Sequence, residues 1–216
     1  MELDHIIAEL GKVATASVAD AVDKVAGKRG YMSHEIKPRI NDKRICGPAV
    51  TVLETATDEV LPPQHALDLI DESPAGSVVC ISIGGTVDVA VWGGLMTAGA
   101  VANQLAGAVL DGGVRDITEI RRDYGFPVYS RSVSPGTTVG RYKTVAAQVP
   151  VEIGGVIVHP GDIIVADIDG VVVVPRQHAE AVLEMAQEID ARELEQAKLI
   201  IAEKSLRKGL AKYGRI

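Results

Sequence analysis

Aromatic residues are scarce in this chain, and positive charge is in deficit. Phe, Trp and Tyr together make up 3% of the 216 residues, and the net charge at pH 7 is −7. Proteins that bind nucleic acid contact phosphates with basic surfaces and often stack aromatic rings on bases. The sequence therefore argues against nucleic acid as a direct partner.

Cysteine and long apolar runs are also rare. Cys46 and Cys80 lie far apart, each in an apolar run and without C-x-x-C spacing, so we expect two buried thiols rather than a disulfide. No apolar stretch approaches the ~20 residues that span a bilayer. The first ten residues are acidic (Glu2, Asp4 and Glu9), unlike a signal peptide. We expect a cytoplasmic protein that does not contact membranes.

The remaining composition is that of a globular domain. Hydrophobic residues make up 47% of the chain and charged residues 24%. A chain of this length buries enough surface to fold without a disulfide or a structural metal. We predict a single domain over residues 1–216.

Helical and extended patterns alternate through the first two thirds of the chain. Short strands without polar residues, alternating with helices, indicate a parallel sheet that is covered on both faces. The spacing of apolar residues predicts one or two short helices in residues 1–26, a loop over 27–41, strands over 46–53, 77–83, 107–110 and 128–130, and helices over 64–71, 95–104 and 117–122.

The pattern changes after residue 145. Runs of Val and Ile over residues 145–175 are separated by Gly-Gly, Pro-Gly and Asp-Gly pairs, which predicts strands joined by tight turns. A long amphipathic helix is expected over 177–207, with Val182, Met185, Ile189, Leu194 and Leu199 on one side. The predicted fold class is α/β, with a central, mostly parallel sheet, a β-rich flank and a long C-terminal helix.

A glycine pair marks the first candidate site. Gly93 and Gly94 precede Leu95 and Met96, where a helix should begin after a strand. Ligands of open α/β sheets bind at the carboxyl ends of strands, and the free N–H groups of a helix N-terminus suit a carboxylate or phosphate. The alternative is close packing of the helix on the sheet.

A second glycine-rich turn is expected at Asp111-Gly112-Gly113. The guanidinium of Arg115, which follows, is suited to a bidentate carboxylate. Asp116 can hold a divalent cation through oxygen, and Glu119, on the same helical face, can orient a water. The alternative is structural, since Asp116 and Glu119 also have the spacing of a capping box and Asp-Gly is a common turn.

Together these segments resemble the RraA-like family. That family includes the regulator of ribonuclease E activity and the class II pyruvate aldolases that act on 4-hydroxy-4-methyl-2-oxoglutarate and 4-carboxy-4-hydroxy-2-oxoadipate. The resemblance extends over most of the chain, and its motifs are Thr15 to Asp20, Trp92 to Met96, Val109 to Asp116 and Pro160 to Val171.

The resemblance implies a swivelling β/β/α domain that assembles as homotrimers, often paired into homohexamers, with sites at the subunit interfaces. It implies that the backbone of Gly93, Gly94, Leu95 and Met96 holds the substrate carboxylate together with Arg115, and that Asp116 binds Mg²⁺ or Mn²⁺. The implied activity is cleavage of a carbon–carbon bond in a small 2-oxo acid through the enolate of pyruvate, by aldol cleavage or by decarboxylation of oxaloacetate. Arg115, Asp116 and Glu119 are the expected catalytic residues.

One position departs from the family pattern. Several aldolases of the family carry an acidic residue where this chain has Gly94, which favours decarboxylation over aldol cleavage because decarboxylation requires no base to take a hydroxyl proton. Two alternatives remain. One is a non-catalytic protein that binds and regulates a ribonuclease; the other is a lyase for a different 2-oxo acid, selected by loops such as residues 55–64.

Overall fold

The computed structural model describes residues 1–211, and its centre is a nine-stranded sheet. The strand order is β1-β6-β5-β3-β2-β10-β11, with β4 paired to β5 and β7 paired to β2. The inner strands β2, β3, β5 and β6 are parallel, and antiparallel strands flank them, which confirms the predicted parallel centre and β-rich flank. The strands of this sheet are β1 (Lys37–Pro38), β2 (Ile45–Ala56), β3 (Val78–Ser82), β4 (Ala90–Trp92), β5 (Gly107–Val114), β6 (Val128–Val133), β7 (Tyr142–Ala147), β10 (Ile163–Asp167) and β11 (Gly170–Val174).

The inner strands are apolar on both faces, and each face fills a different core. All residues of β3 and β5 are buried. Val79 and Ile81 of β3 pack toward one cluster, while Val78 and Cys80 pack toward another. This is the burial expected of a parallel sheet covered on both sides.

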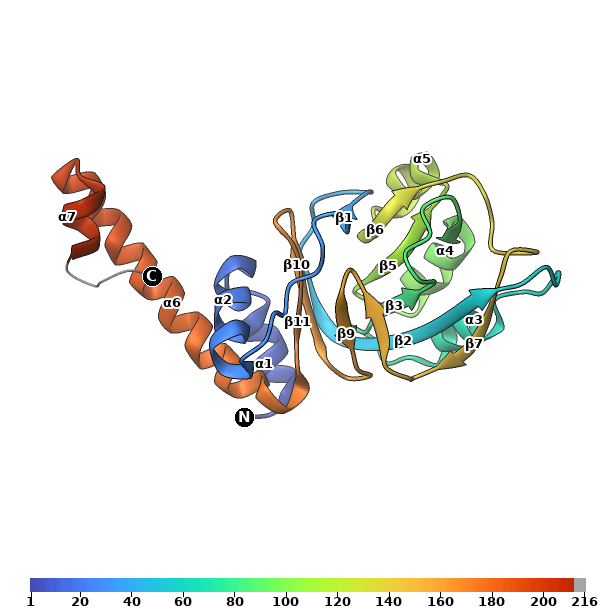
Figure 1. Cartoon of the computed structure of the whole chain (residues 1–216), viewed down its shortest axis with the longest axis horizontal. Coiled ribbons are helices and arrows are strands. Elements are labelled where there is room, and N and C mark those ends of the chain that lie inside the picture. Colours follow the sequence, from blue (N-terminus) through green and yellow to red (C-terminus); the bar gives the residue numbers. More distant parts are fainter. Residues whose placement is uncertain (212–216) are drawn as a thin grey trace.

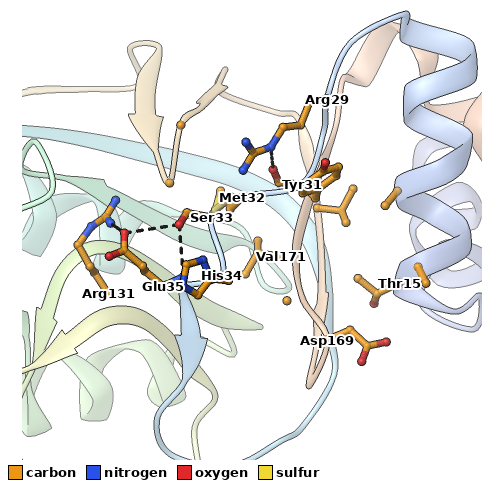
Figure 2. A pocket seen from close by; sticks show the side chains of 16 residues that line it. Thr15, Arg29, Tyr31, Met32, Ser33, His34, Glu35, Arg131, Asp169 and Val171 are labelled. Atoms are coloured by element: carbon orange, nitrogen blue, oxygen red, sulfur yellow. Dashed lines mark hydrogen bonds and ion pairs between the residues drawn. The ribbon is translucent and has the colours of Figure 1, made fainter.

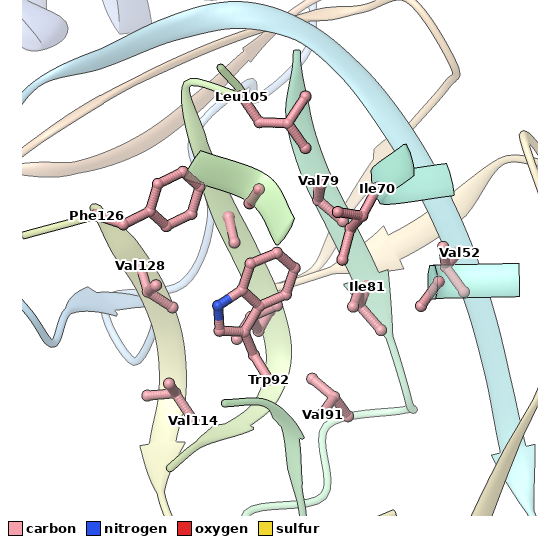
Figure 3. Close-up of a cluster of buried hydrophobic side chains, with 14 of the residues drawn as sticks. Val52, Ile70, Val79, Ile81, Val91, Trp92, Leu105, Val114, Phe126 and Val128 are labelled. Carbon is pink, nitrogen blue, oxygen red and sulfur yellow. The ribbon is translucent and has the colours of Figure 1, made fainter. Parts of the chain in front are cut away.

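Helices and a hairpin cover the two faces. α3 (Gln64–Glu72) and α4 (Gly94–Ala102) pack over the core that surrounds Trp92 (Figure 3). The hairpin of β8 (Val151–Ile153) and β9 (Val156–Val158) closes the other core. α1 (Leu3–Leu10), α2 (Thr15–Ala26) and the first half of α6 pack on β10 and β11 (Figure 1). Of these helices, α3 and α4 contribute residues to the predicted site.

The structure corrects the turn predicted at Asp111-Gly112-Gly113. These residues continue β5 as far as Val114. A Cβ atom at Gly112 would lie 2.7 Å from Ile83 Cδ1, and one at Gly113 would lie 2.9 Å from the Val89 carbonyl oxygen. The glycines therefore let the segment before β4 pack directly on the end of β5, and they do not make a turn.

The C-terminal helix is shorter than predicted. α6 (Ala179–Glu203) ends because Lys204 adopts a left-handed conformation with φ of 48°, and α7 (Leu206–Ala211) follows. Ile189 is buried, but Leu194, predicted on the same apolar side, is 60% exposed. The C-terminal part of α6 extends past the body of the molecule, where it packs against α7 (Figure 1), so apolar residues there have few other elements to pack against.

Two further expectations concern local elements. The helix predicted over 117–122 forms as a short α5 (Ile117–Glu119) that continues as a π-helical turn, Ile120–Tyr124. Cys46 and Cys80 are both free thiols, as predicted, but only Cys80 is fully buried, while Cys46 is half-buried; burial raises the pKa of each. Among the described helices, none is both long and apolar enough to cross a membrane.

A carboxyl group is buried at the carboxyl end of β2. Glu54 is 4% exposed, and in the described part of the chain neither of its oxygens has a hydrogen-bond partner. It pairs with Thr144 of β7, whose Oγ1 lies 2.8 Å from Nδ1 of His65, so Glu54 shares the face that α3 covers. Burial raises the pKa of Glu54 to about 7.

This pKa makes stability depend on pH. Because the folded protein holds the Glu54 proton more tightly than the unfolded chain, the free energy of unfolding should fall as pH rises from about 4.5 to about 7, by up to about 3 kcal/mol. The glutamine side chain of Glu54→Gln stays neutral at every pH, so this variant should lose this part of the pH dependence. Urea unfolding at pH 5 and at pH 8 measures the free energy of unfolding of the variant and of the wild type. Glu152→Gln, at an exposed position on β8, is the control. If Glu54→Gln changed the free energy of unfolding by the same amount at pH 5 and at pH 8, the raised pKa of Glu54 would be contradicted.

Candidate active site

The end of β4 is fixed by a buried tryptophan. Trp92 is 1% exposed and stacks on Phe126, with ring centroids 6.0 Å apart (Figure 3). Its Nε1 donates to Thr97 Oγ1 at 2.8 Å, and that hydroxyl donates to the Gly93 carbonyl oxygen at 2.9 Å. The strand end and the first turn of α4 are therefore held as one rigid unit.

The N-terminus of α4 faces a carboxylate from β5. α4 begins at Gly94, and Gly93 before it has no side chain that could cap the helix. Asp116 Oδ2 instead accepts the N–H of Gly94 at 2.8 Å. Helix geometry leaves the next N–H groups, those of Leu95 and Met96, without an intrahelical acceptor. These two groups remain able to bind an anion.

Arg115 and Asp116 follow directly from β5. The N–H of Arg115 donates to the Trp92 carbonyl oxygen at 3.0 Å, which ties this segment to β4. Asp116 has a φ of 60°, a left-handed conformation that is uncommon outside glycine and that turns the chain sharply at the site. Arg115 Nε lies 3.7 Å from Asp116 Oδ2, and both side chains are 42% exposed. Among the described residues, the terminal nitrogens of Arg115 and Asp116 Oδ1 have no hydrogen-bond or ion-pair partner.

The two glycines of the site have different surroundings. A Cβ atom at Gly93 would lie 2.8 Å from Asp116 Oδ2 and 3.2 Å from Arg115 Nε, so only glycine fits there without a shift. A Cβ atom at Gly94 would lie 3.5 Å from Asp116 Oδ2, an ordinary contact distance. Packing therefore does not forbid a side chain at Gly94, the position where the sequence departs from the pattern of the resembled family.

These groups share one cavity of about 210 Å³. It brings together the predicted binding residues Gly93, Gly94, Leu95 and Met96 with Arg115 and Asp116. Glu119 is exposed in α5 and is not among the lining residues. The rest of the lining consists of Pro63, Leu67, Ala90, Val91, Trp92, Thr137, Thr138 and Val139.

The wall formed by residues 137–139 was not predicted from the sequence. It belongs to the loop between β6 and β7, and it is held against β4 because Ala90 N–H donates to the Gly136 carbonyl oxygen at 2.7 Å. Thr137 forms an isolated bridge with Ala90. The only sequence signal for this wall is the Pro135-Gly136 pair, which marks a loop without indicating where it packs.

A larger cavity, of about 750 Å³, lies elsewhere, between α2 and residues 29–35 (Figure 2). Its Arg131 forms ion pairs with Glu35 and with Asp111, the latter at 2.5 Å. The guanidinium of Arg29 lies 4.6 Å from the Tyr31 ring centroid. None of the predicted site residues lines it.

Asp111 thus has a structural role that the sequence did not reveal. Its Oδ1 accepts from Arg131 and, at 3.1 Å, from the N–H of Gly154 in the β8–β9 turn. The buried carboxylate therefore joins β5, β6 and the hairpin that covers the second core.

The chain is similar to several known proteins. The family model RraA-like, described as Aldolase/RraA, matches residues 15–173. A protein of Halalkalibacterium halodurans named "Putative 4-hydroxy-4-methyl-2-oxoglutarate aldolase" is 32% identical over 88% of this chain and 85% of its own length. Protein DlpA of Legionella pneumophila is 33% identical over 84% of this chain, which spans 29% of DlpA.

A solved structure has the same fold. The Streptomyces coelicolor protein RraAS2, titled an unusual member of the RNase ES inhibitor RraA protein family, superposes with a TM-score of 0.77 and 26% identity, covering 88% of this chain and 93% of RraAS2. The match of the family model to most of the chain, together with the aldolase relative, establishes the resemblance seen in the motifs. The chain belongs to the RraA-like family.

Proposed function

We propose that this protein is a divalent-metal-dependent lyase that cleaves a carbon–carbon bond in 2-oxo acids through the enolate of pyruvate. The candidate reactions are aldol cleavage of 4-hydroxy-4-methyl-2-oxoglutarate and decarboxylation of oxaloacetate. The observation that carries the proposal is one cavity lined by helix N–H groups, the Arg115 guanidinium and an oxygen of Asp116 that have no hydrogen-bond partner within residues 1–211. The name of the aldolase relative supports the same class of reaction.

The chain's own groups suit the anion that both reactions develop. The N–H groups of Leu95 and Met96 and the fork of Arg115 would bind the substrate carboxylate. Because the hydrogen bonds of Trp92 and Thr97 fix the start of α4, these donors need little rearrangement as the enolate forms. Among the described residues, no lysine lines the cavity, so none of them offers a nucleophile for a Schiff base there.

Asp116 is the residue that would hold the metal. Within residues 1–211, no three His, Cys, Asp or Glu side chains gather as a metal site, and Asp116 carries the only carboxylate among the described residues that line the cavity. Mg²⁺ accepts such a site when water and substrate oxygens complete its coordination, and Mn²⁺ favours the same ligands. Bound there, either ion would supply a Lewis acid for the enolate oxygen. Glu119, outside the cavity lining, would act on the substrate only through water.

The direct test is pyruvate release from oxaloacetate and from 4-hydroxy-4-methyl-2-oxoglutarate, with Mg²⁺, with EDTA and with the Asp116→Ala variant. Spontaneous decarboxylation of oxaloacetate is subtracted. We expect turnover that EDTA and Asp116→Ala both abolish. Absence of turnover in the correctly folded wild-type protein would instead favour a non-catalytic regulator.

Arg115 should contribute mainly to the transition state. Replacing it with Ala removes a donor to the developing anion, and kcat/KM should fall by roughly 10²- to 10³-fold, as with the loss of one oxyanion donor. Steady-state kinetics with added Mg²⁺ measures this, and an unchanged melting temperature shows that the fold is intact. A loss of less than about threefold would contradict the assigned role.

Gly93 and Gly94 form a matched pair for testing the site geometry. Gly93→Ala should displace Asp116 or Arg115 and lower kcat/KM by roughly 10- to 100-fold, since small misplacements of catalytic groups are costly. Gly94→Ala adds the same methyl group one residue later at ordinary contact distance and should stay within about threefold of wild type. Equal losses of kcat/KM in the two variants would show that the close contact of Gly93 with Asp116 and Arg115 does not determine the activity.

A further inference from the structure

Glu54, near the end of β2, is a buried carboxyl group that the proposed function does not use. It is 4% exposed, and both of its side-chain oxygens are enclosed without a hydrogen-bond partner in the described part of the chain. Because this chain by itself encloses both oxygens, a second protein chain or a ligand reaches them only if part of the cover moves. A buried polar group without a partner is rare in folded proteins and calls for a specific cause.

The neighbours of Glu54 in the sheet offer it no charge. On β7 its cross-strand partner is Thr144, and on the other side Leu53 lies opposite Ser82 of β3, so Ile83 follows beside Glu54. α3 packs over the same face, against both β2 and β7 (Figure 1). An ionised carboxylate in this position would therefore lie between an apolar side chain and a hydroxyl.

The titratable groups on the covering elements do not pair with Glu54 either. These groups are His65, Asp68, Asp71 and Glu72 of α3, Tyr142 of β7 and Asp88 after β3. Those of α3 and Asp88 are exposed, and the Tyr142 hydroxyl lies 2.7 Å from Thr86 Oγ1. Lys143 is on the opposite face of β7 and is paired with Glu59. No cation among residues 1–211 therefore compensates a charge on Glu54.

The first turn of α3, residues 64–67, is the part of the cover with the fewest polar ties. Pro63 supplies no side-chain cap, and Thr144 Oγ1 instead accepts the His65 N–H at 3.2 Å and lies 2.8 Å from Nδ1 of the same residue. Backbone ladders join β2 to β7, and the segment after β3 is fixed by backbone hydrogen bonds at Val89 and Ala90. The hydroxyl beside Glu54 thus holds this turn to the sheet.

We propose that Glu54 is a proton-operated latch for the first turn of α3. With a protonated carboxyl, the turn stays packed over β2 and β7; with an ionised carboxyl, the turn separates from the sheet and water reaches the carboxylate. An enclosed charge without a cation costs more than the contacts of one helical turn. Burial raises the pKa of Glu54 to about 7, which places this change near neutral pH.

The latch adjoins the candidate cavity. Pro63 and Leu67, at the two ends of the turn, both line it. Movement of the turn would therefore change the shape of the cavity, a consequence that rests on the proposed function. The latch itself depends on no activity, so an experiment without substrate tests it, and its failure would leave the proposed function standing.

The test is backbone amide exchange of the full-length protein at pH 6 and pH 8, measured by mass spectrometry and expressed as protection relative to the unfolded chain. Ionisation favours the open turn until pH passes the pKa of the closed state, so the protection of residues 65–68 should fall about 10-fold. These residues should exchange faster than β3 at both pH values. Unchanged protection, or exchange no faster than that of β3, would overturn the latch.

A matched pair of variants tests whether Glu54 causes the change. Glu54→Gln keeps the size of the side chain and stays neutral, so the protection of residues 65–68 should agree within about twofold at pH 6 and pH 8. Glu152→Gln, at an exposed position on β8, should keep the 10-fold change. The same pH dependence in both variants would overturn the assignment to Glu54.

Thr144→Val tests the tie between the turn and the sheet without altering the carboxyl group. Loss of one hydrogen bond should lower the protection of residues 65–68 by about 5-fold at pH 6 and leave that of β3 unchanged. Unaltered protection of the first turn in this variant would show that Thr144 does not hold it, against the proposal.

Discussion

The hydrogen bond from the Gly94 N–H to Asp116 Oδ2 joins the two segments on which the site depends. One segment ends β4 and begins α4; the other ends β5. They lie close because β4 and β5 pair in parallel and because Gly93 leaves room for the carboxylate. Asp116 thus supplies the helix cap that Gly93 cannot, using Oδ2, while its Oδ1 has no hydrogen-bond partner among the described residues. In the proposed function, capping and metal binding would share this one side chain, so a substitution there would disturb both.

Much of this arrangement could be predicted from the sequence because it depends on local pattern. Runs such as residues 77–83 contain no polar interruption except serine, which fits a strand buried on both faces, and glycines before an Ala-rich segment fit a helix start. The resemblance to the family predicts that Arg115 and Asp116 act together with Gly93 and Gly94, and these residues line one cavity. These predictions concern residues whose conformation depends on their own backbone or on their near neighbours.

The predictions from the sequence are wrong or incomplete where contacts between segments far apart in the chain determine the structure. Asp-Gly is a good turn signal, yet Gly112 and Gly113 lie in a strand because Ile83 and Val89 pack where side chains would otherwise project. The amphipathic spacing of α6 persists beyond the point where the body of the molecule ends, so the same pattern gives a buried Ile189 and an exposed Leu194. Residues 137–139 face the cavity only through pairing with β4, which no local pattern encodes.

The two halves of the cavity follow from two different parts of the fold. The charged half comes from the carboxyl ends of β4 and β5, whose geometry is constrained by sheet pairing, by the stacked Trp92 and by the absence of a side chain at Gly93. The uncharged half comes from the start of α3 and the loop before β7, segments that can change side chains without disturbing the sheet. In the proposed function, recognition of the pyruvate unit would belong to the rigid centre of the domain. Selection of the group joined to that unit would belong to the connecting segments, where members of one fold can differ in substrate while keeping the same chemistry.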